Sequence, residues 1–199
     1  METFSQEISF SAGSNNTEFT IDDNDSFKAN GIGSHFAIEY AMPIFFNLER
    51  VSYSLGLNLN EYNAMTGDLN NLYEWQTTHL GLKNGLNVRF IDVFDIVSFN
   101  GSASLNLSHI LNGYHKINTQ VFDISNHPEF RGLTLWSEFG VSAKFNFNED
   151  VKLSVGYSVS EDYSFTSTRG AVFYDGTTDE NVKMKNCRFT LSLIYLLND

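Results

Sequence analysis

Alternation of apolar and polar residues is the dominant pattern of this chain, and it is clearest between Val97 and Ser108. Apolar or small residues occupy the odd positions of this stretch, and only Ser and Asn occupy the even positions. A period of two is typical of a β-strand with two unlike faces. A face exposed to water is usually rich in charged residues. The small uncharged face therefore indicates a crowded, wet interior such as a barrel lumen, with the apolar face towards lipid.

Seven further segments repeat this alternation. The eight expected strands cover Glu7–Gly13, Ser34–Phe46, Val51–Asn60, Trp75–Phe90, Val97–Leu111, Leu133–Asn146, Val151–Ser160 and Lys185–Leu197. The apolar parity changes at residues 14–16, which predicts a bulge or bend in the first strand. The connections alternate between long segments (21–33, 62–74, 112–132 and 161–180) and short ones. The fold class predicted is all-β: residues 1–199 form one domain, an eight-stranded antiparallel up-and-down transmembrane β-barrel with four long loops at one end and three short turns at the other.

Strand length and aromatic placement both agree with a membrane barrel. The apolar set from Val51 to Leu59 spans nine residues, and at about 3.3 Å per residue and a tilt near 45° it covers roughly 20 Å of membrane. No apolar run approaches the roughly 18 residues of a transmembrane helix. Aromatic residues gather towards the expected strand ends, which predicts girdles at the two membrane surfaces. The girdle set is Phe45, Phe46, Phe90, Phe99, Phe145, Phe147, Tyr62 and Trp75.

Charged residues fall on the polar faces of the strands. We expect them to form a polar network inside the lumen, because both signs occur and an unpaired buried charge is costly. An eight-stranded barrel is filled by its own side chains, so we expect a structural plug and no open pore. The lumen set is Glu39, Lys83, Arg89, Glu138, Lys144, Lys152 and Arg188.

Composition restricts the partners and the compartment. The 199 residues carry a formal net charge of −12 and no basic patch, which argues against nucleic acid. The single Cys187 excludes an intramolecular disulfide and a Cys-rich zinc site. The first ten residues have neither the basic start nor the apolar core of a signal peptide. We therefore expect a bacterial outer-membrane protein whose export signal has been removed; the alternative is a soluble cytosolic protein.

The pattern resembles the small eight-stranded outer-membrane barrels of the OmpX and OmpA membrane-domain type, over nearly the whole chain. The Phe- and Asn-rich composition and the segment Phe4–Gln6 resemble such barrels in Bacteroidota. Members of this family usually end the last strand on an aromatic residue, and this chain departs from them by ending Leu197-Asn198-Asp199. The resemblance implies a lipid and lipopolysaccharide environment, with other envelope proteins as further partners.

Two barrels of similar type are enzymes, a lipid A deacylase and a palmitoyltransferase, with a Ser and a His near the outer rim. Here Ser108 and His109 are adjacent, with His115 and Glu129 further along. Neighbours on a strand point to opposite faces, so we assign no catalytic pair. The acidic segments at residues 22–25 and 175–180 do not have the spacing of a calcium loop, so we expect no metal and no cofactor.

We therefore expect a non-enzymatic outer-membrane barrel with a structural or binding role through its long loops, including that of an accessory subunit of a larger complex. Two alternatives remain. One is a lipid-modifying acyl hydrolase or acyltransferase, and the other is a soluble barrel that carries an apolar ligand.

Overall fold

The structure is a computed structural model that describes residues 6–21, 24–44, 50–67, 72–94, 96–125, 132–163 and 182–197. Its strands are β1 (Gln6–Ile21), β2 (Asn24–Pro43), β3 (Val51–Gly67), β4 (Leu72–Val93), β5 (Val97–Ile117), β6 (Gln120–Asp123), β7 (Leu133–Asn146), β8 (Val151–Tyr163) and β9 (Val182–Leu197). The described part of the chain holds no helix long and apolar enough to cross a membrane.

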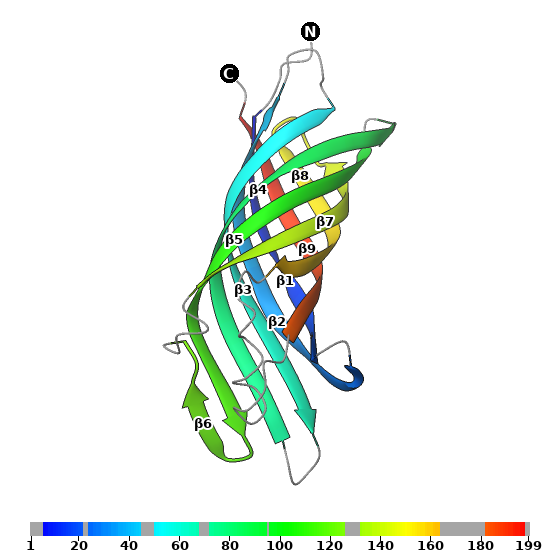
Figure 1. The fold of residues 1–199 in the computed structure, drawn as a ribbon. Coiled ribbons are helices and arrows are strands. Elements are labelled where there is room, and N and C mark those ends of the chain that lie inside the picture. The colour runs from blue at the N-terminus through cyan, green and yellow to red at the C-terminus, as the bar shows by residue number, and fades with distance from the viewer. Residues whose placement is uncertain are drawn as a thin grey trace.

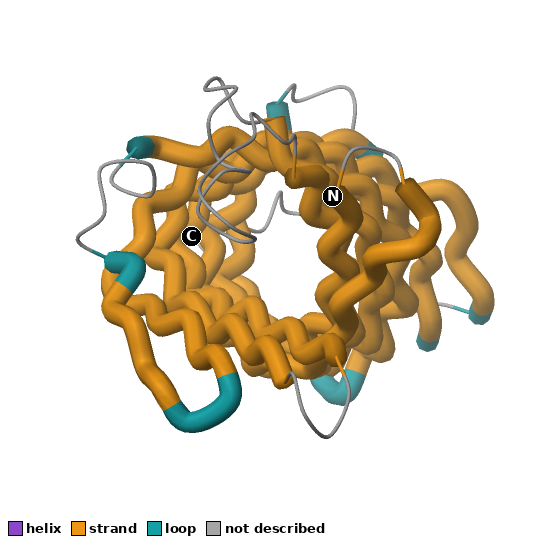
Figure 2. The backbone as a smooth tube through the Cα atoms, turned by 60° about the horizontal axis from the view of Figure 1, so that its bottom comes forward, coloured by secondary structure: helices purple, strands orange, loops and turns teal. Residues whose placement is uncertain are grey.

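Eight of the described strands close into one antiparallel barrel (Figures 1 and 2). Each strand pairs with the next one along the wall, and β1 closes the ring by pairing with β9 from Gln6↔Leu197 to Ile21↔Val182. The additional strand β6 forms a hairpin with the far part of β5. This arrangement confirms the predicted all-β fold class and the eight-stranded up-and-down order.

The two ends of the barrel differ. At the short-turn end β2 is followed by β3, β4 by β5 and β7 by β8, and the start of β1 and the end of β9 also lie there (Figure 1). In the turn between β7 and β8, the Asn148 side chain accepts hydrogen bonds from the backbone N–H groups of Asp150 and Val151 at 2.9 and 2.7 Å. The opposite end, here called the extended end, carries the β1–β2, β3–β4 and β5–β6 hairpins.

The wall is much taller on one side than on the other. Strands β4 and β5 have 22 and 21 residues, whereas β7 and β8 have 14 and 13. Three segments expected to be loops are therefore partly strand: 21–33 lies mostly in β1 and β2, 62–74 lies mostly in β3 and β4, and 112–132 contains the end of β5 and all of β6. In the segment 161–180, β8 continues to Tyr163, and the rest lies outside the described residues.

The expected bulge at residues 14–16 is wrong. β1 pairs with β2 without a break from Glu7 to Thr20, and the ladder shifts only between Thr20 and Ile21. Asn15 and Thr17 are fully buried in the lumen while Ser14 and Asn16 face outwards. Both faces of the strand are polar here, so the change in apolar parity marks the end of the apolar outer band and not a bend.

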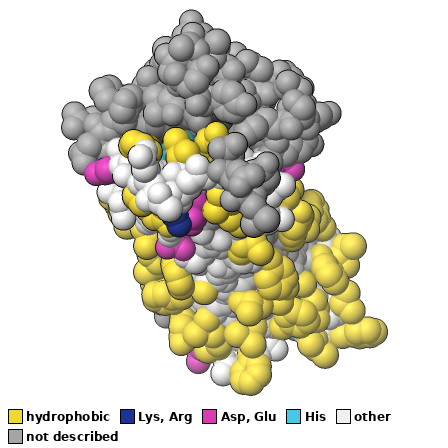
Figure 3. Space-filling view, turned by 90° about the horizontal axis from the view of Figure 1, so that it is seen from below, with side chains coloured by type: hydrophobic (Ala, Val, Ile, Leu, Met, Phe, Trp, Pro, Cys, Tyr) yellow, Lys and Arg dark blue, Asp and Glu magenta, His cyan; other side chains and the backbone are white. Residues whose placement is uncertain are grey.

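The strands turn their apolar faces outwards. Phe36, Leu57, Leu82 and Phe139 are 46–65% exposed, whereas Asn58, Asn106 and Ser108 are at most 2% exposed. In the view of Figure 3, apolar side chains cover the wall of the barrel. The molecule therefore has the opposite distribution of polarity from a water-soluble barrel, whose apolar residues fill the interior.

Candidate functional site

A chain of four charged side chains crosses the lumen. The Lys83 Nζ atom lies 2.9 Å from Glu39 Oε1 and 3.0 Å from Glu138 Oε1. Arg188 Nη1 donates to Glu138 Oε2 at 2.7 Å, and the side chains of these two residues are only 2% and 5% exposed. Two acids and two bases share the chain, so their formal charges cancel. Mutual pairing is what makes this burial tenable, because an isolated charge would be strongly destabilising here.

Asparagine side chains continue the network towards the extended end. The Asn15 Oδ1 atom accepts from Arg188 Nε at 2.8 Å and from Asn186 Nδ2 at 3.2 Å, while its Nδ2 donates to the carbonyl oxygens of Ser34 and Glu61. A second series runs from Asn60 Nδ2 to Asn58 Oδ1 at 2.7 Å and from Asn58 Nδ2 to Asn106 Oδ1 at 3.1 Å. His35 Nδ1 lies 2.7 Å from Asn60 Oδ1. An amide both donates and accepts, so these side chains satisfy one another across the ring.

An aromatic pair fills the lumen beyond the asparagines. Trp136 and Tyr62 are each 1% exposed, and their rings stack with centroids 4.9 Å apart and an interplanar angle of 16°. The Trp136 Nε1–H group donates to Ser108 Oγ at 3.0 Å, and the ring of His79 packs edge-on against Tyr62. Together with the ion pairs, these buried rings fill the middle of the lumen.

The half of the lumen near the short-turn end is less densely filled. Glu7 Oε2 lies 2.7 Å from Lys144 Nζ and Glu7 Oε1 lies 3.1 Å from Lys152 Nζ. The small side chains here leave a cavity of about 120 Å³, bounded on the far side by Glu39, Lys83 and Glu138. A polar space of this size holds a few water molecules. It is a chamber that ends at the ion pairs.

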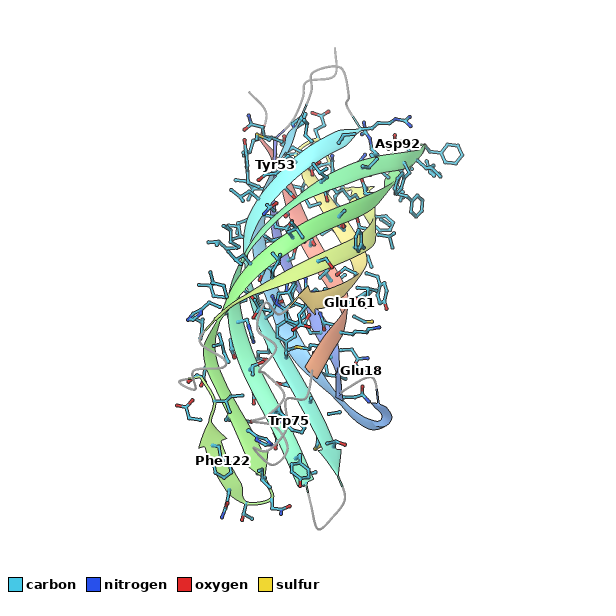
Figure 4. The ribbon with its side chains drawn as sticks, viewed as in Figure 1. Glu18, Tyr53, Trp75, Asp92, Phe122 and Glu161 are labelled. Carbon is cyan, nitrogen blue, oxygen red and sulfur yellow. The ribbon has the colours of Figure 1, made fainter. Side chains whose placement is uncertain are left out.

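A second aromatic cluster lies at the extended end, where β4, β5 and β6 extend beyond the rest of the wall. Trp75 and His115 stack with ring centroids 4.8 Å apart, and Tyr73 lies 6.1 Å from Trp75. Trp75 also packs with the buried Ala29 and Ala64. Figure 4 shows Trp75 and Phe122 at this end, with Tyr53 and Asp92 at the opposite end. Burial lowers the pKa of the His115 imidazole from 6.5 to about 4.

Comparisons with known proteins identify the architecture. No family model matches the chain, and no curated protein matches its sequence. Among solved structures, OprG from Pseudomonas aeruginosa superposes with a TM-score of 0.53 at 8% identity, covering 99% of this chain and 98% of OprG. Neisserial surface protein A gives a TM-score of 0.51 at 10% identity, covering 94% of this chain and 96% of that protein. The chain has the fold of the small outer-membrane β-barrels. At this level of identity the likeness describes the fold and carries over no activity or ligand.

The structure brings most of the expected lumen residues together. Glu39, Lys83, Glu138 and Arg188 form the central chain, and Lys144 and Lys152 share Glu7. Arg89 stands apart from them near the short-turn end, with its Nε atom 3.7 Å from Asp92 Oδ2. The single network that the sequence predicts is therefore, in the structure, two separate groups of ion pairs and one residue at the rim.

The expected aromatic girdle is wrong for two residues. Tyr62 and Trp75 are 1% and 3% exposed and point into the barrel, because they continue the inward parity of Asn60 and Thr77. The remaining described members, Phe90, Phe99, Phe145 and Phe147, lie on the outer surface towards the short-turn end and are 40–76% exposed. Phe45 and Phe46 lie outside the described residues.

The Ser and His residues considered for acyl chemistry do not meet. Ser108 points into the lumen and accepts the Trp136 hydrogen bond, whereas His109 is exposed on the outer surface. His115 belongs to the extended-end cluster, and Glu129 lies outside the described residues. The described residues contain no group of three or more His, Cys, Asp or Glu side chains that could hold a metal ion.

Sequence reasoning missed the asparagine series and the extended-end cluster. The inward parity of Asn58, Asn60 and Tyr62 is visible in the sequence, and extending it by steps of two would have placed Tyr62 inside. His115 could not be placed in this way, because the β4–β5 ladder shifts register between Thr78 and His79. Up to Ile110 the even-numbered residues of β5 face inwards. Beyond the shift the inward residues are odd-numbered, at Gly113 and His115.

Acidification is expected to loosen the extended-end cluster. The folded pKa of His115, about 4, lies below the ordinary value of 6.5, so the neutral imidazole stabilises the folded cluster. This contribution is complete above about pH 6.5 and is lost as the pH falls from about 6.5 towards 4. The measurement is the fluorescence of Trp75 in a Trp136→Phe background, where Trp75 is the one remaining tryptophan. A His115→Phe variant should give a flat profile over this range, and an unchanged transition in that variant would assign the effect to another group.

Proposed function

We propose that this protein is an integral outer-membrane barrel that acts as a closed scaffold and binds a partner through its extended end. The partner is either another cell-envelope protein or an external surface. Lipid and lipopolysaccharide surround the wall in this proposal, and the short-turn end faces the periplasm.

The single observation that carries the membrane assignment is the inverted distribution of polarity. The outward side chains of β4 run apolar from Leu80 to Phe90 apart from Asn84, while Thr77, His79 and Gly81 face in and are buried. The roughly ten residue-to-residue steps from Leu80 to Phe90, at about 3.3 Å each and a tilt near 45°, cover roughly 23 Å, close to the apolar band of about 25 Å in such barrels. In water this surface would leave a large continuous apolar area exposed, which soluble monomers avoid. A soluble carrier would need the opposite orientation.

The closed lumen supports a scaffold and argues against a diffusion channel. A solute entering from the short-turn end would meet the Glu39–Lys83–Glu138–Arg188 chain, and beyond it the Tyr62–Trp136 stack. Opening a path would require separating buried ion pairs, which is costly.

The tall part of the wall supports a binding role at the extended end. Strands β3, β4 and β5 continue well past their apolar outer bands, and the β5–β6 hairpin ends in a turn at Asn118 and Thr119. Val121 and Phe122 on this hairpin are 64% and 45% exposed. Apolar side chains exposed on a protruding hairpin are suited to contact with another macromolecule.

The proposal is tested by membrane insertion of the purified chain. We expect the folded protein to float with phosphatidylcholine vesicles, to resist alkaline extraction, and to migrate differently on a denaturing gel before and after boiling. Planar bilayers that contain it should show no steady conductance. A chain that stays monodisperse without detergent and does not float would overturn the membrane assignment. Stable open channels would overturn the closed scaffold.

A further inference from the structure

One amide interrupts the apolar outer band of β4. Asn84 is exposed on the outer surface, between Leu82 and Leu86 along its own strand. Its ladder partners are Leu55 on β3 and Leu105 on β5, which are 44% and 46% exposed. Asn84 is therefore surrounded by leucines that face the same way.

The depth of Asn84 makes it unusual. At about 3.3 Å per residue and a tilt near 45°, it lies about 9 Å from the level of Leu80 and about 14 Å from the level of Phe90, the two ends of the β4 band. A short side chain does not reach the polar headgroups from that depth. The outward polar residues Asn16 and Glu161 follow the ends of their apolar bands, whereas the small hydroxyl residue Ser137 lies within the β7 band on the same rung as Asn84.

The described residues offer the Asn84 side chain no hydrogen bond, whereas inward asparagines are satisfied. Asn58 and Asn106 lie on the two neighbouring strands and bond to each other through the lumen at 3.1 Å. Acyl chains carry no donor or acceptor, so an amide facing them loses the hydrogen bonds it makes in water, which is unfavourable. A protein partner with a polar group at the same depth removes this cost.

We propose that Asn84 marks a face through which two copies of this chain pair in the membrane, with the two Asn84 amides bonded to each other. An amide donates and accepts, so two identical amides facing across a two-fold axis satisfy one another. Copies inserted in the same direction are related by an axis along the membrane normal, and this symmetry places both Asn84 residues at the same depth. The inference rests on the membrane location proposed above.

The surrounding surface suits close approach. Ala103 on β5 is exposed beside this position, opposite Leu86 in the ladder, and Ser137 on β7 lies on the same rung beyond Leu105. Small residues let the backbones of two membrane segments come near each other, and hydroxyl groups add polar contacts. The pairing face therefore consists of Asn84, Ala103, Leu105 and Ser137.

The test is energy transfer between copies in phosphatidylcholine vesicles. A Cys187→Ser, Glu149→Cys chain is labelled separately with donor and acceptor at the exposed turn, and insertion is verified first by the gel shift on boiling. We expect transfer that persists on dilution with lipid, and the Asn84→Leu change should weaken the dimer about tenfold. Val155→Leu, on the β8 part of the outer surface, is the matched control and should leave the dimer unchanged.

A cross-link gives a second readout. In the Cys187→Ser background, Asn84→Cys should form a disulfide-linked dimer on oxidation, because the two positions face each other and the disulfide traps even a dimer weakened by loss of the amides, whereas Val155→Cys should stay monomeric. An inserted protein that remains monomeric at every lipid ratio, or a dimer unaffected by Asn84→Leu, overturns the pairing. Cross-linking of Asn84→Cys only to a different protein in native membranes also overturns it. A chain that does not insert contradicts the membrane proposal itself.

Discussion

Replacing Glu138 with glutamine is expected to lower the free energy of unfolding by about 3–5 kcal/mol. Glu138 is the one residue of the central chain that contacts both bases, Lys83 at 3.0 Å and Arg188 at 2.7 Å. Glutamine has nearly the same size, so the change removes the negative charge and leaves little cavity. Lys83 then keeps Glu39, but Arg188, which is 2% exposed, loses its carboxylate partner. The loss is the energy of leaving a buried charge without compensation.

Urea titration of the folded barrel in detergent, read by the gel shift on boiling, measures this change. Glu149→Gln in the exposed turn between β7 and β8 is the matched control and should stay within about 0.5 kcal/mol of the parent. Equal stabilities of the two variants would show that the central ion pairs contribute nothing measurable.

Replacing Trp136 with alanine is expected to cost about 3–5 kcal/mol of stability. Trp136 is fully enclosed, and its removal leaves a cavity beside Tyr62 and strips Ser108 of its donor. The surrounding strands are held in register by their ladders, so they cannot collapse into the space.

The Trp136→Phe change separates packing from hydrogen bonding in the same titration. It keeps an aromatic ring against Tyr62 and loses the bond to Ser108, so we expect a loss of about 0.5–1.5 kcal/mol. If the alanine variant were as stable as the phenylalanine variant, the ring stacked on Tyr62 would contribute nothing measurable to stability.

The alternation of apolar and polar residues predicts the strands correctly where their outward side chains form the apolar band. The strand Leu133–Asn146 has the predicted bounds, because apolar outward residues continue to both of its ends. The prediction fails beyond the band, where outward residues such as Asn16 and Glu61 become polar and the two faces of a strand no longer differ. The girdle prediction places Tyr62 at the membrane surface for this reason, although its parity alone places it inside.

The sequence predicts which residue types line the lumen, but it does not predict which of these side chains contact one another. A lumen lined with Glu, Lys and Arg follows from parity, but the partners follow from register. Lys144 meets Glu7, 137 residues away along the chain, because β1, β9, β8 and β7 lie in that order around the ring. The shifts at Thr78 and Arg89 in the β4–β5 ladder have no marker in the sequence, so partners cannot be counted across them.

The bonds of Asn15 tie the order of folding to barrel closure. Its carboxamide oxygen binds Asn186 and Arg188 on the last strand, and its amide nitrogen binds Ser34 and Glu61 on the two strands that follow it in sequence. The bonds of the amide nitrogen can therefore form while β1, β2 and β3 assemble, and the bonds of the oxygen wait for residues more than 170 positions away. Such distant contacts make folding slow. The docking of the final strand therefore closes the ring and completes the hydrogen bonds of Asn15 at the same time.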